Sequence, residues 1–355
     1  MSYTSDERTV PRVQVDGFGF LPDDYSNIVR RYTITNKNNA VVRLITLGAG
    51  IQSITLPNKN ADMVDVILGF DNVNDYLQIR HIGRIVGCQL NCDDCAFDMV
   101  NWEAYILGEQ VVMTHVSLEP EILTQVTYTW TDENRLHVDI CAYATKCTQV
   151  DFGYHCFFNL AGHGMGAKEL ENHYVTVNAE RWIEQDIKCN LPTGVLKKIH
   201  KTVYDLRYPT RLNAKKLRQV PGGGYNHNFC INNPSGEWCY RFHARMTHPN
   251  SGRSLEVLSN HPAMKFYTGN DLPDPNRILF RDIYNNDVSE NRTTCFKKII
   301  GKDGLPYRRH GCFALIPQGY PNASQFQHFP SNLLESGKIY VHNLTYDFGV
   351  DDLIV

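Results

Sequence analysis

Hydrophobic and polar residues alternate with a period of two along much of the chain. Clear examples are residues 41–46, 126–130 and 136–141, which are rich in β-branched and aromatic side chains. Alternation of this kind, bounded by turn-forming residues, is typical of half-buried β-strands. The polar residues 131–134 separate two of these runs and predict a hairpin turn.

Helical periodicity is almost absent from the sequence. The candidate segments, such as residues 74–79, are no longer than about two turns. Many strands at short spacing with little helix predict an all-β sandwich or barrel. We find no fixed-period repeat and no low-complexity linker, so we expect residues 1–25 to form an N-terminal arm or edge strand and residues 26–350 to form a single domain.

Composition and charge argue against nucleic-acid-binding and membrane proteins. Of the 355 residues 42% are hydrophobic and 21% are charged, and the formal net charge is -3. Nothing in this balance predicts attraction to nucleic acid or to an anionic membrane. The N-terminus does not resemble a signal peptide, and the longest apolar runs are too short to span a bilayer. We therefore expect a cytoplasmic protein whose 11 cysteines are mostly reduced thiols.

Several motifs, in order along residues 30–349, resemble the aldose 1-epimerase (galactose mutarotase) family. Each motif is weak alone, but their order and spacing together are specific. They lie at residues 45–56, 66–76, 82–85, 97–103, 155–164, 191–194, 224–229, 266–270 and 329–340. The resemblance implies a galactose mutarotase-like β-supersandwich of antiparallel strands, with a sugar cleft on one face.

The family's reaction opens a cyclic hemiacetal, rotates the C1 carbonyl and closes the ring again. It needs a base for the C1 hydroxyl and an acid for the ring oxygen. The resemblance implies a glutamate as base and a histidine as acid, with a second histidine, an arginine, an aspartate and a glutamine holding the sugar. His155 occupies the position of the acid.

The position of the base is changed. Counted back from Phe329, the family glutamate falls on Ile316. Gln327 and His328 offer a second register, in which the base position is Gln325. Neither isoleucine nor glutamine can abstract a proton, so the base is lost in both registers.

Most of the sugar-holding positions also differ. Asn226 replaces the aspartate, Cys88 replaces the arginine and Lys265 replaces the glutamine. No counterpart of the second histidine precedes Phe97, whereas Arg84 of the same motif as Cys88 is retained. We name Arg84, Asn159, Asn226 and Lys265 as candidate ligand-binding residues and His155 as the candidate acid.

These replacements predict a non-catalytic homologue, or pseudoenzyme, that binds a carbohydrate or a protein through a remodelled cleft. A first alternative is an active epimerase of hexoses in which His155 is the acid and a carboxylate such as Asp151 or Asp271 is the base. A second alternative is a purely structural or interaction protein with a closed cleft. The sequence leaves open whether catalysis survives, and it does not identify the ligand, the partner or the oligomeric state.

A cysteine cluster precedes Phe97. Cys88, Cys92 and Cys95 stand close to Asp93 and Asp94, a spacing compatible with Zn²⁺ binding. Three cysteines do not complete a tetrahedral site, so we favour free thiols over a metal site, and a disulfide would require an oxidising compartment. We expect neither a cofactor nor a metal.

Overall fold

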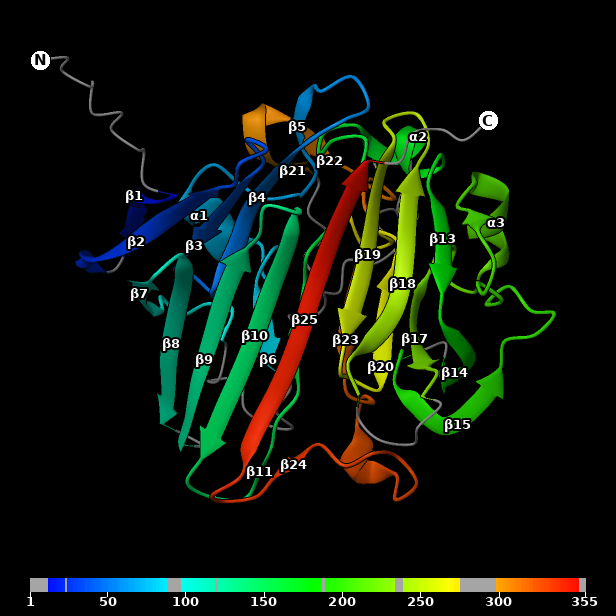
Figure 1. Cartoon of the computed structure of the whole chain (residues 1–355). Coiled ribbons are helices and arrows are strands. Elements are labelled where there is room, and N and C mark those ends of the chain that lie inside the picture. The colour runs from blue at the N-terminus through cyan, green and yellow to red at the C-terminus, as the bar shows by residue number, and fades with distance from the viewer. Residues whose placement is uncertain are drawn as a thin grey trace, which may run out of the picture.

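In a computed structural model, which describes residues 12–22, 24–87, 97–118, 121–186, 189–233, 239–274 and 298–350, the chain is built mainly from antiparallel β-strands (Figure 1). A nine-stranded sheet forms one layer of the molecule. Its strands, in spatial order, are β16 (Thr210–Arg211), β13 (Tyr174–Val177), β18 (Arg241–His248), β19 (Arg253–Ser259), β25 (Ile339–Val350), β10 (Arg135–Ala144), β9 (Glu121–Trp130), β8 (Gln110–Leu118) and β7 (Glu103–Leu107).

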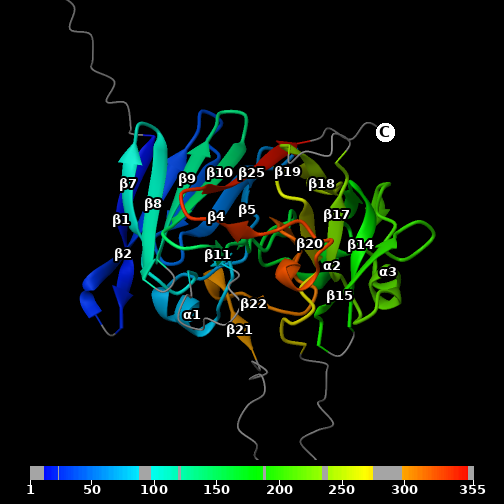
Figure 2. The same ribbon diagram turned by 90° about the horizontal axis from the view of Figure 1, so that it is seen from below.

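Two five-stranded sheets pack behind this layer, at its opposite ends (Figure 2). The first consists of β1 (Val13–Leu21), β2 (Asp24–Thr35), β3 (Val41–Ile45), β4 (Gly50–Pro57) and β5 (Met63–Asp65). The second consists of β15 (Pro192–Lys198), β14 (Ala179–Gln185), β17 (Asn226–Ile231), β20 (Ala263–Tyr267) and β23 (Ala314–Gln318).

Short elements join the sheets. Three strand pairs are formed by β6 (Ile85–Gly87) with β12 (Phe152–Tyr154), β11 (Thr148–Gln149) with β24 (Leu333–Leu334), and β21 (Ile299–Ile300) with β22 (Pro306–Tyr307). The α-helices of the described residues are α1 (Val73–Gln78), α2 (Gly166–Leu170) and α3 (Ala214–Gln219), and 3₁₀ turns lie at Lys302–Gly304 and Ala323–Gln325. None of these helices is long and apolar enough to cross a membrane.

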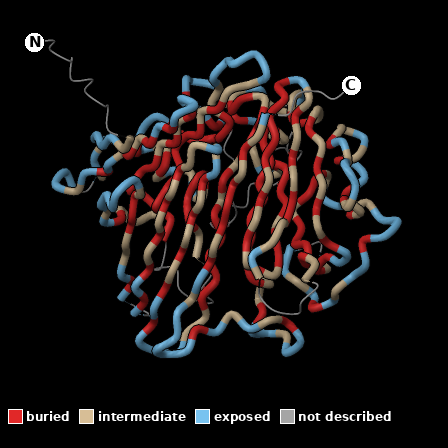
Figure 3. Tube along the Cα trace, in the orientation of Figure 1, coloured by how far each residue is buried: buried red, intermediate tan, exposed pale blue. Residues whose placement is uncertain are grey.

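The predicted all-β class with few short helices is confirmed. Strands β9 and β10 alternate buried and more exposed residues along their length, as the sequence pattern predicts for a sheet with one covered face. Strands β17 and β23 are buried along almost their whole length, with no alternation between their two faces, and buried residues line the inner strands throughout the molecule (Figure 3). Part of the expected N-terminal arm is β1, which forms the edge of its sheet by pairing with β2.

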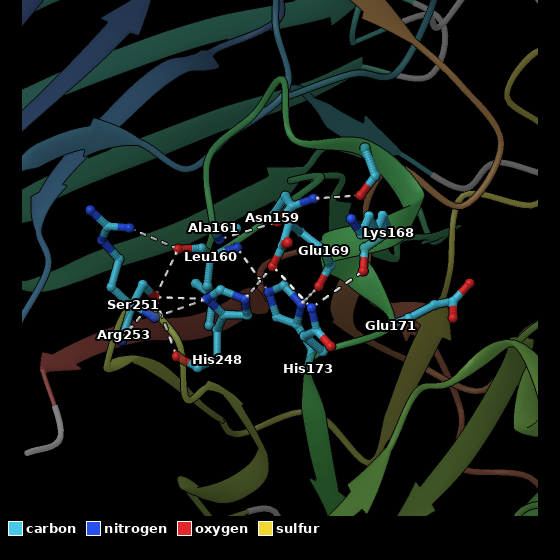
Figure 4. Close-up of polar contacts among 12 residues, drawn as sticks. Asn159, Leu160, Ala161, Lys168, Glu169, Glu171, His173, His248, Ser251 and Arg253 are labelled. Atoms are coloured by element: carbon cyan, nitrogen blue, oxygen red, sulfur yellow. Dashed lines mark hydrogen bonds and ion pairs between the residues drawn. The ribbon is translucent and has the colours of Figure 1, made fainter. Parts of the chain in front are cut away.

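A buried polar network fixes the loop that follows residue 159 (Figure 4). His173, 0% exposed, donates from Nδ1 to the Glu169 carbonyl at 2.8 Å and accepts at Nε2 from the Leu160 amide at 3.0 Å. The His248 ring lies against it, with Nε2 3.0 Å from the Glu169 carboxylate. Arg253 donates to the Leu160 carbonyl at 2.9 Å. The loop is therefore held by donors and acceptors that have no access to water as an alternative.

This network predicts that the protein loses stability in acid. Burial, with the neighbouring His248, lowers the pKa of His173 to about 3, whereas an unfolded histidine titrates near 6.5. Between these values the unfolded chain binds the extra proton, so the free energy of unfolding falls as the pH is lowered, by about 1.4 kcal/mol per pH unit for each such histidine. We expect urea denaturation at pH 7 to 4 to show this slope.

The matched variants are His173→Gln, which removes the titrating group, and His200→Gln, which changes an exposed histidine. His173→Gln is expected to flatten the pH dependence by about one proton, and His200→Gln to leave it unchanged. An unaltered slope in His173→Gln would contradict the assignment.

Candidate functional site

The extended segment 154–159 lies at the centre of the molecule and is bonded on both of its sides. The Gly83 amide donates to the His155 carbonyl at 2.8 Å, and the His155 amide donates to the Arg84 carbonyl at 3.0 Å. Further on, Phe158 and Phe313 exchange two backbone hydrogen bonds, of 2.7 and 2.9 Å. Because the backbone is fixed from both sides, the side chains of this segment have defined positions.

The central strands of the second five-stranded sheet present a polar row toward His155. Lys265 of β20 lies directly opposite Asn228 of β17 and Ile316 of β23. Residues directly opposite in antiparallel strands project from the same face. A Cβ placed on Gly153 would lie 3.0 Å from Ile316 Cγ2 and 3.5 Å from His155 Nε2. We call the residues His155, Asn226, Asn228, Lys265 and Ile316 the site face.

The position expected to hold the base is apolar in its surroundings as well as in its side chain. Ile316 is 1% exposed and forms a small cluster with Tyr267, Ala314 and Phe157. The rings of Phe157 and Tyr267 meet edge to face, with centroids 5.7 Å apart. A carboxylate is therefore absent from this position, and the neighbours that replace it provide no proton acceptor.

His155 is partly buried and has no hydrogen-bond partner for its ring among the described residues. Burial lowers its pKa to about 3, and the positive charge of Lys265 acts in the same direction. The ring is consequently neutral at pH 7. A neutral imidazole can donate one hydrogen bond and accept another, but it is a much weaker acid than imidazolium.

A second histidine, which the sequence analysis missed, lies beside His155. The ring centroids of His81 and His155 are 5.8 Å apart, and His81 Nδ1 is 3.0 Å from Asp98 Oδ2. Arg80 Nη2 forms an ion pair with Oδ1 of the same carboxylate at 2.8 Å. Burial alone would raise the pKa of Asp98, but its contacts with His81 and Arg80 outweigh burial and hold the pKa well below the usual range.

Only one feature of the sequence points to His81, its place just before the Gly83–Arg84 turn. Its backbone has φ 76°, in the left-handed region that is uncommon for residues other than glycine. Strained conformations of this kind concentrate at functional sites.

Two of the sequence-predicted site residues are built into the fold. Arg84 is 0% exposed and donates to the carbonyls of Asp98 and Ile79, at 2.7 Å each. Asn159 is also 0% exposed, and its Nδ2 donates to the carbonyl of Gly311 at 3.0 Å. All three of these carbonyls belong to the backbone, so both side chains are bonded within the fold.

Asn226 opens into a cavity of about 180 Å³. Its Oδ1 is buried and has no hydrogen-bond partner in the described structure. The lining residues are Asn190, Pro221, Gly222, Asn226, His227, Asn270, Asp271 and Arg309. Of the two carboxylates considered as substitute bases, Asp271 lines this cavity, whereas Asp151 lines a different cavity of about 270 Å³ with Tyr340 and Lys338.

The cysteine cluster at residues 88, 92 and 95 lies outside the described residues. Within them, no group of three or more histidine, cysteine or acidic side chains is arranged to hold a metal ion. The site face thus offers hydrogen-bond donors and acceptors, one ammonium and an apolar floor. Such a set can bind a hydroxylated ligand, and the position opposite Lys265 lacks the general base that ring opening needs.

Comparison with known proteins identifies the relatives of this chain. The family model described as aldose 1-epimerase matches residues 100–347. The galactose mutarotase of Bos taurus is 30% identical over 342 residues, covering 87% of this chain and 91% of the relative. The galactose mutarotase of Homo sapiens is 29% identical over 342 residues, which again cover 87% of this chain and 91% of the relative.

Solved structures support the fold. A GalM/aldose epimerase homologue from C. elegans superposes with a TM-score of 0.74 at 20% identity, over 90% of this chain and 98% of that one. The galactose 1-epimerase of Lactobacillus acidophilus gives a TM-score of 0.71 at 17% identity, over 96% of this chain and 99% of that one. The predicted mutarotase-like fold is thereby confirmed.

The geometry of the site face yields a direct electrostatic prediction. The charge of Lys265 lowers the pKa of both His155 and His227, in addition to burial. Lys265→Met should therefore raise both pKa values, because the imidazolium form no longer faces a like charge. Histidine ring NMR titration measures the change. His173, whose pKa shift has no contribution from Lys265, is the internal control, and equal shifts in all three residues would refute the arrangement.

Proposed function

The chain belongs to the aldose 1-epimerase family, and we propose that it is a member that binds a carbohydrate and does not catalyse mutarotation. One observation carries the proposal. Polar side chains of the site face, among them Asn226 whose Oδ1 has no partner among the described residues, lie beside a base position that is filled by Ile316 and its apolar neighbours. We further propose a cytoplasmic location, on the sequence grounds given above, and a protein partner stays a prediction from the sequence.

The binding half of the proposal rests on unused hydrogen-bonding capacity. Asn226 Oδ1 has no partner within the described structure. Asn228 uses its Oδ1 to accept from Gln318 Nε2 at 3.0 Å, and its Nδ2 has no acceptor among the described residues. A buried polar group that is left unpaired costs roughly 1–3 kcal/mol. Sugar hydroxyls, which both donate and accept, satisfy groups of this kind.

The proposed lack of catalysis rests on the two proton transfers that the reaction needs. Ring opening requires a base at the C1 hydroxyl and an acid at the ring oxygen, each contributing on the order of a hundredfold or more in rate. Ile316 cannot accept a proton. His155 is uncharged at neutral pH because burial and Lys265 disfavour its cationic form. Both steps are therefore impaired at once.

A second candidate function is favoured by one observation. The His81 ring, with Nδ1 3.0 Å from Asp98, lies beside His155. A carboxylate close to a histidine stabilises the imidazolium that forms when the ring acts as a general base, although His81 Nδ1 does not meet hydrogen-bond geometry with any described residue. In that case the protein would be a hexose epimerase with His81 as base and His155 as acid.

Polarimetry on α-D-galactose and α-D-glucose, with ligand-observed NMR on the same sugars, distinguishes these functions. We expect saturable sugar binding with no rate above the spontaneous reaction, and loss of binding in Asn226→Ala. Exposed Asn38→Ala is the matched control and should bind normally. A rate that disappears in both His81→Ala and His155→Ala would establish the epimerase, and absence of binding to any sugar would leave the structural alternative.

Restoring the glutamate should not restore the enzyme. In Ile316→Glu the new carboxylate would stand directly opposite the Lys265 ammonium, at a cross-strand distance that favours an ion pair. Such a pair lowers the carboxyl pKa and weakens it as a base. We expect less than about one hundredth of the rate of an active relative assayed in parallel by polarimetry. Full rescue by this single change would show that the remaining site is intact.

A further inference from the structure

Lys265 is a cation without a counter-ion among the described residues. The described residues provide its ammonium with no hydrogen bond and no ion pair, although the side chain is largely buried in the middle of the sheet. Burial lowers its pKa, and the charge of Asp271 acts on it without forming a contact. An ammonium in this setting gains free energy from any anion that reaches it, because buried charges are normally paired.

The residues directly opposite Lys265 on the neighbouring strands are uncharged. Asn228 and Ile316 flank Lys265 on the neighbouring strands, and Ile316 belongs to the apolar cluster with Tyr267 and Phe157. None of these side chains carries negative charge. The two neighbouring strands therefore supply no counter-ion at the positions opposite Lys265.

We propose that the ligand of this site is a monosaccharide bearing a carboxylate, as in a hexuronic acid, and that Lys265 recognises the carboxylate. This inference rests on the proposed carbohydrate binding and names the class of sugar. Asn228 supplies the second donor through its Nδ2, because its Oδ1 is already engaged by Gln318. Two donors on adjacent strands match the two oxygens of one carboxylate.

The sugar ring extends from Lys265 toward Asn226. Asn226 is the diagonal neighbour of Lys265, two residues along β17 from the directly opposite Asn228. Diagonal neighbours on one face of an antiparallel pair lie about 7–8 Å apart. A ligand with its carboxylate at Lys265 can extend a ring hydroxyl toward Asn226, which lines the neighbouring cavity and whose buried Oδ1 has no partner among the described residues.

A single ammonium fits a carboxylate better than a phosphate. A phosphate monoester carries close to two negative charges near neutral pH and is usually met by several cations. Arg309, a cation that lines the Asn226 cavity, already donates to His310 Nε2 and to the Gly222 carbonyl. It also shares its cavity with Asp271, which offsets its charge.

Binding constants for matched sugars test the assignment. The ligands are D-galactose, D-galacturonate and galactose 6-phosphate, with the corresponding glucose series, measured by calorimetry in low and in 0.5 M salt. We expect the hexuronate to bind about tenfold or more tighter than the hexose, since a charge-assisted hydrogen bond replaces a neutral one. High salt should reduce this preference.

Two variants and a control locate the effect. Lys265→Gln keeps a donor but removes the charge, so it should bind hexose and hexuronate equally. Ile316→Glu retains Lys265 but supplies an internal counter-ion, so it should lose the hexuronate preference as well. Lys146→Gln, an exposed lysine, should behave as the unmodified protein.

The outcomes separate the two proposals. Equal binding of hexose and hexuronate by the unmodified protein overturns the carboxylate assignment and leaves carbohydrate binding intact. Preference for the 6-phosphate overturns the assignment in favour of a phosphate site. A hexuronate preference that survives Lys265→Gln overturns the role of Lys265. Failure to bind any of the six sugars overturns the proposed function itself.

Discussion

The double-sided hydrogen bonding of segment 154–159 is the constraint on which the site depends. The segment pairs with residues 83–84 on one side and with Phe313 on the other, so it joins the part of the fold built around β1–β5 to the part built around β14–β23. Each side needs the segment to satisfy its own backbone groups. A shift of one residue would reverse which side chains face the interior, and His155 would no longer share a face with Lys265.

The same constraint explains why the site can lose its chemistry while the fold stays intact. The residues that position the segment, Arg84 and Asn159 among them, bond to backbone carbonyls and contribute to stability whatever the ligand. On the site face, Asn226 Oδ1 makes no hydrogen bond among the described residues. Ile316 even adds apolar contacts in place of a buried carboxylate, whose desolvation would be unfavourable. Substitution at the site face is therefore tolerated by the fold, and it changes only what the face can bind or catalyse.

The sequence predicted the architecture well, because period-two alternation reports directly on sheets with one covered face. It was less informative for the candidate site. Arg84 and Asn159 were named as ligand-binding residues from their motifs, and a motif does not show that both side chains are buried and bonded to backbone carbonyls. His81 was missed because its approach to His155 follows from a left-handed turn and from Asp98, 17 positions further along the chain. The partners of Asn228 depend on strand register, which no local pattern encodes.

The unpaired groups of the site face also bear on the alternative of a closed, purely structural cleft. Among the described residues Asn226 Oδ1 has no partner and Lys265 has no counter-ion, and in such a protein each would cost free energy relative to an apolar side chain. Ile316 shows that apolar replacement is compatible with this sheet, since it packs with Tyr267 and Phe157 without strain on the strand pairing. Apolar packing at one position beside unsatisfied polar groups at the next is the pattern expected of a surface shaped by a ligand that itself supplies the missing partners.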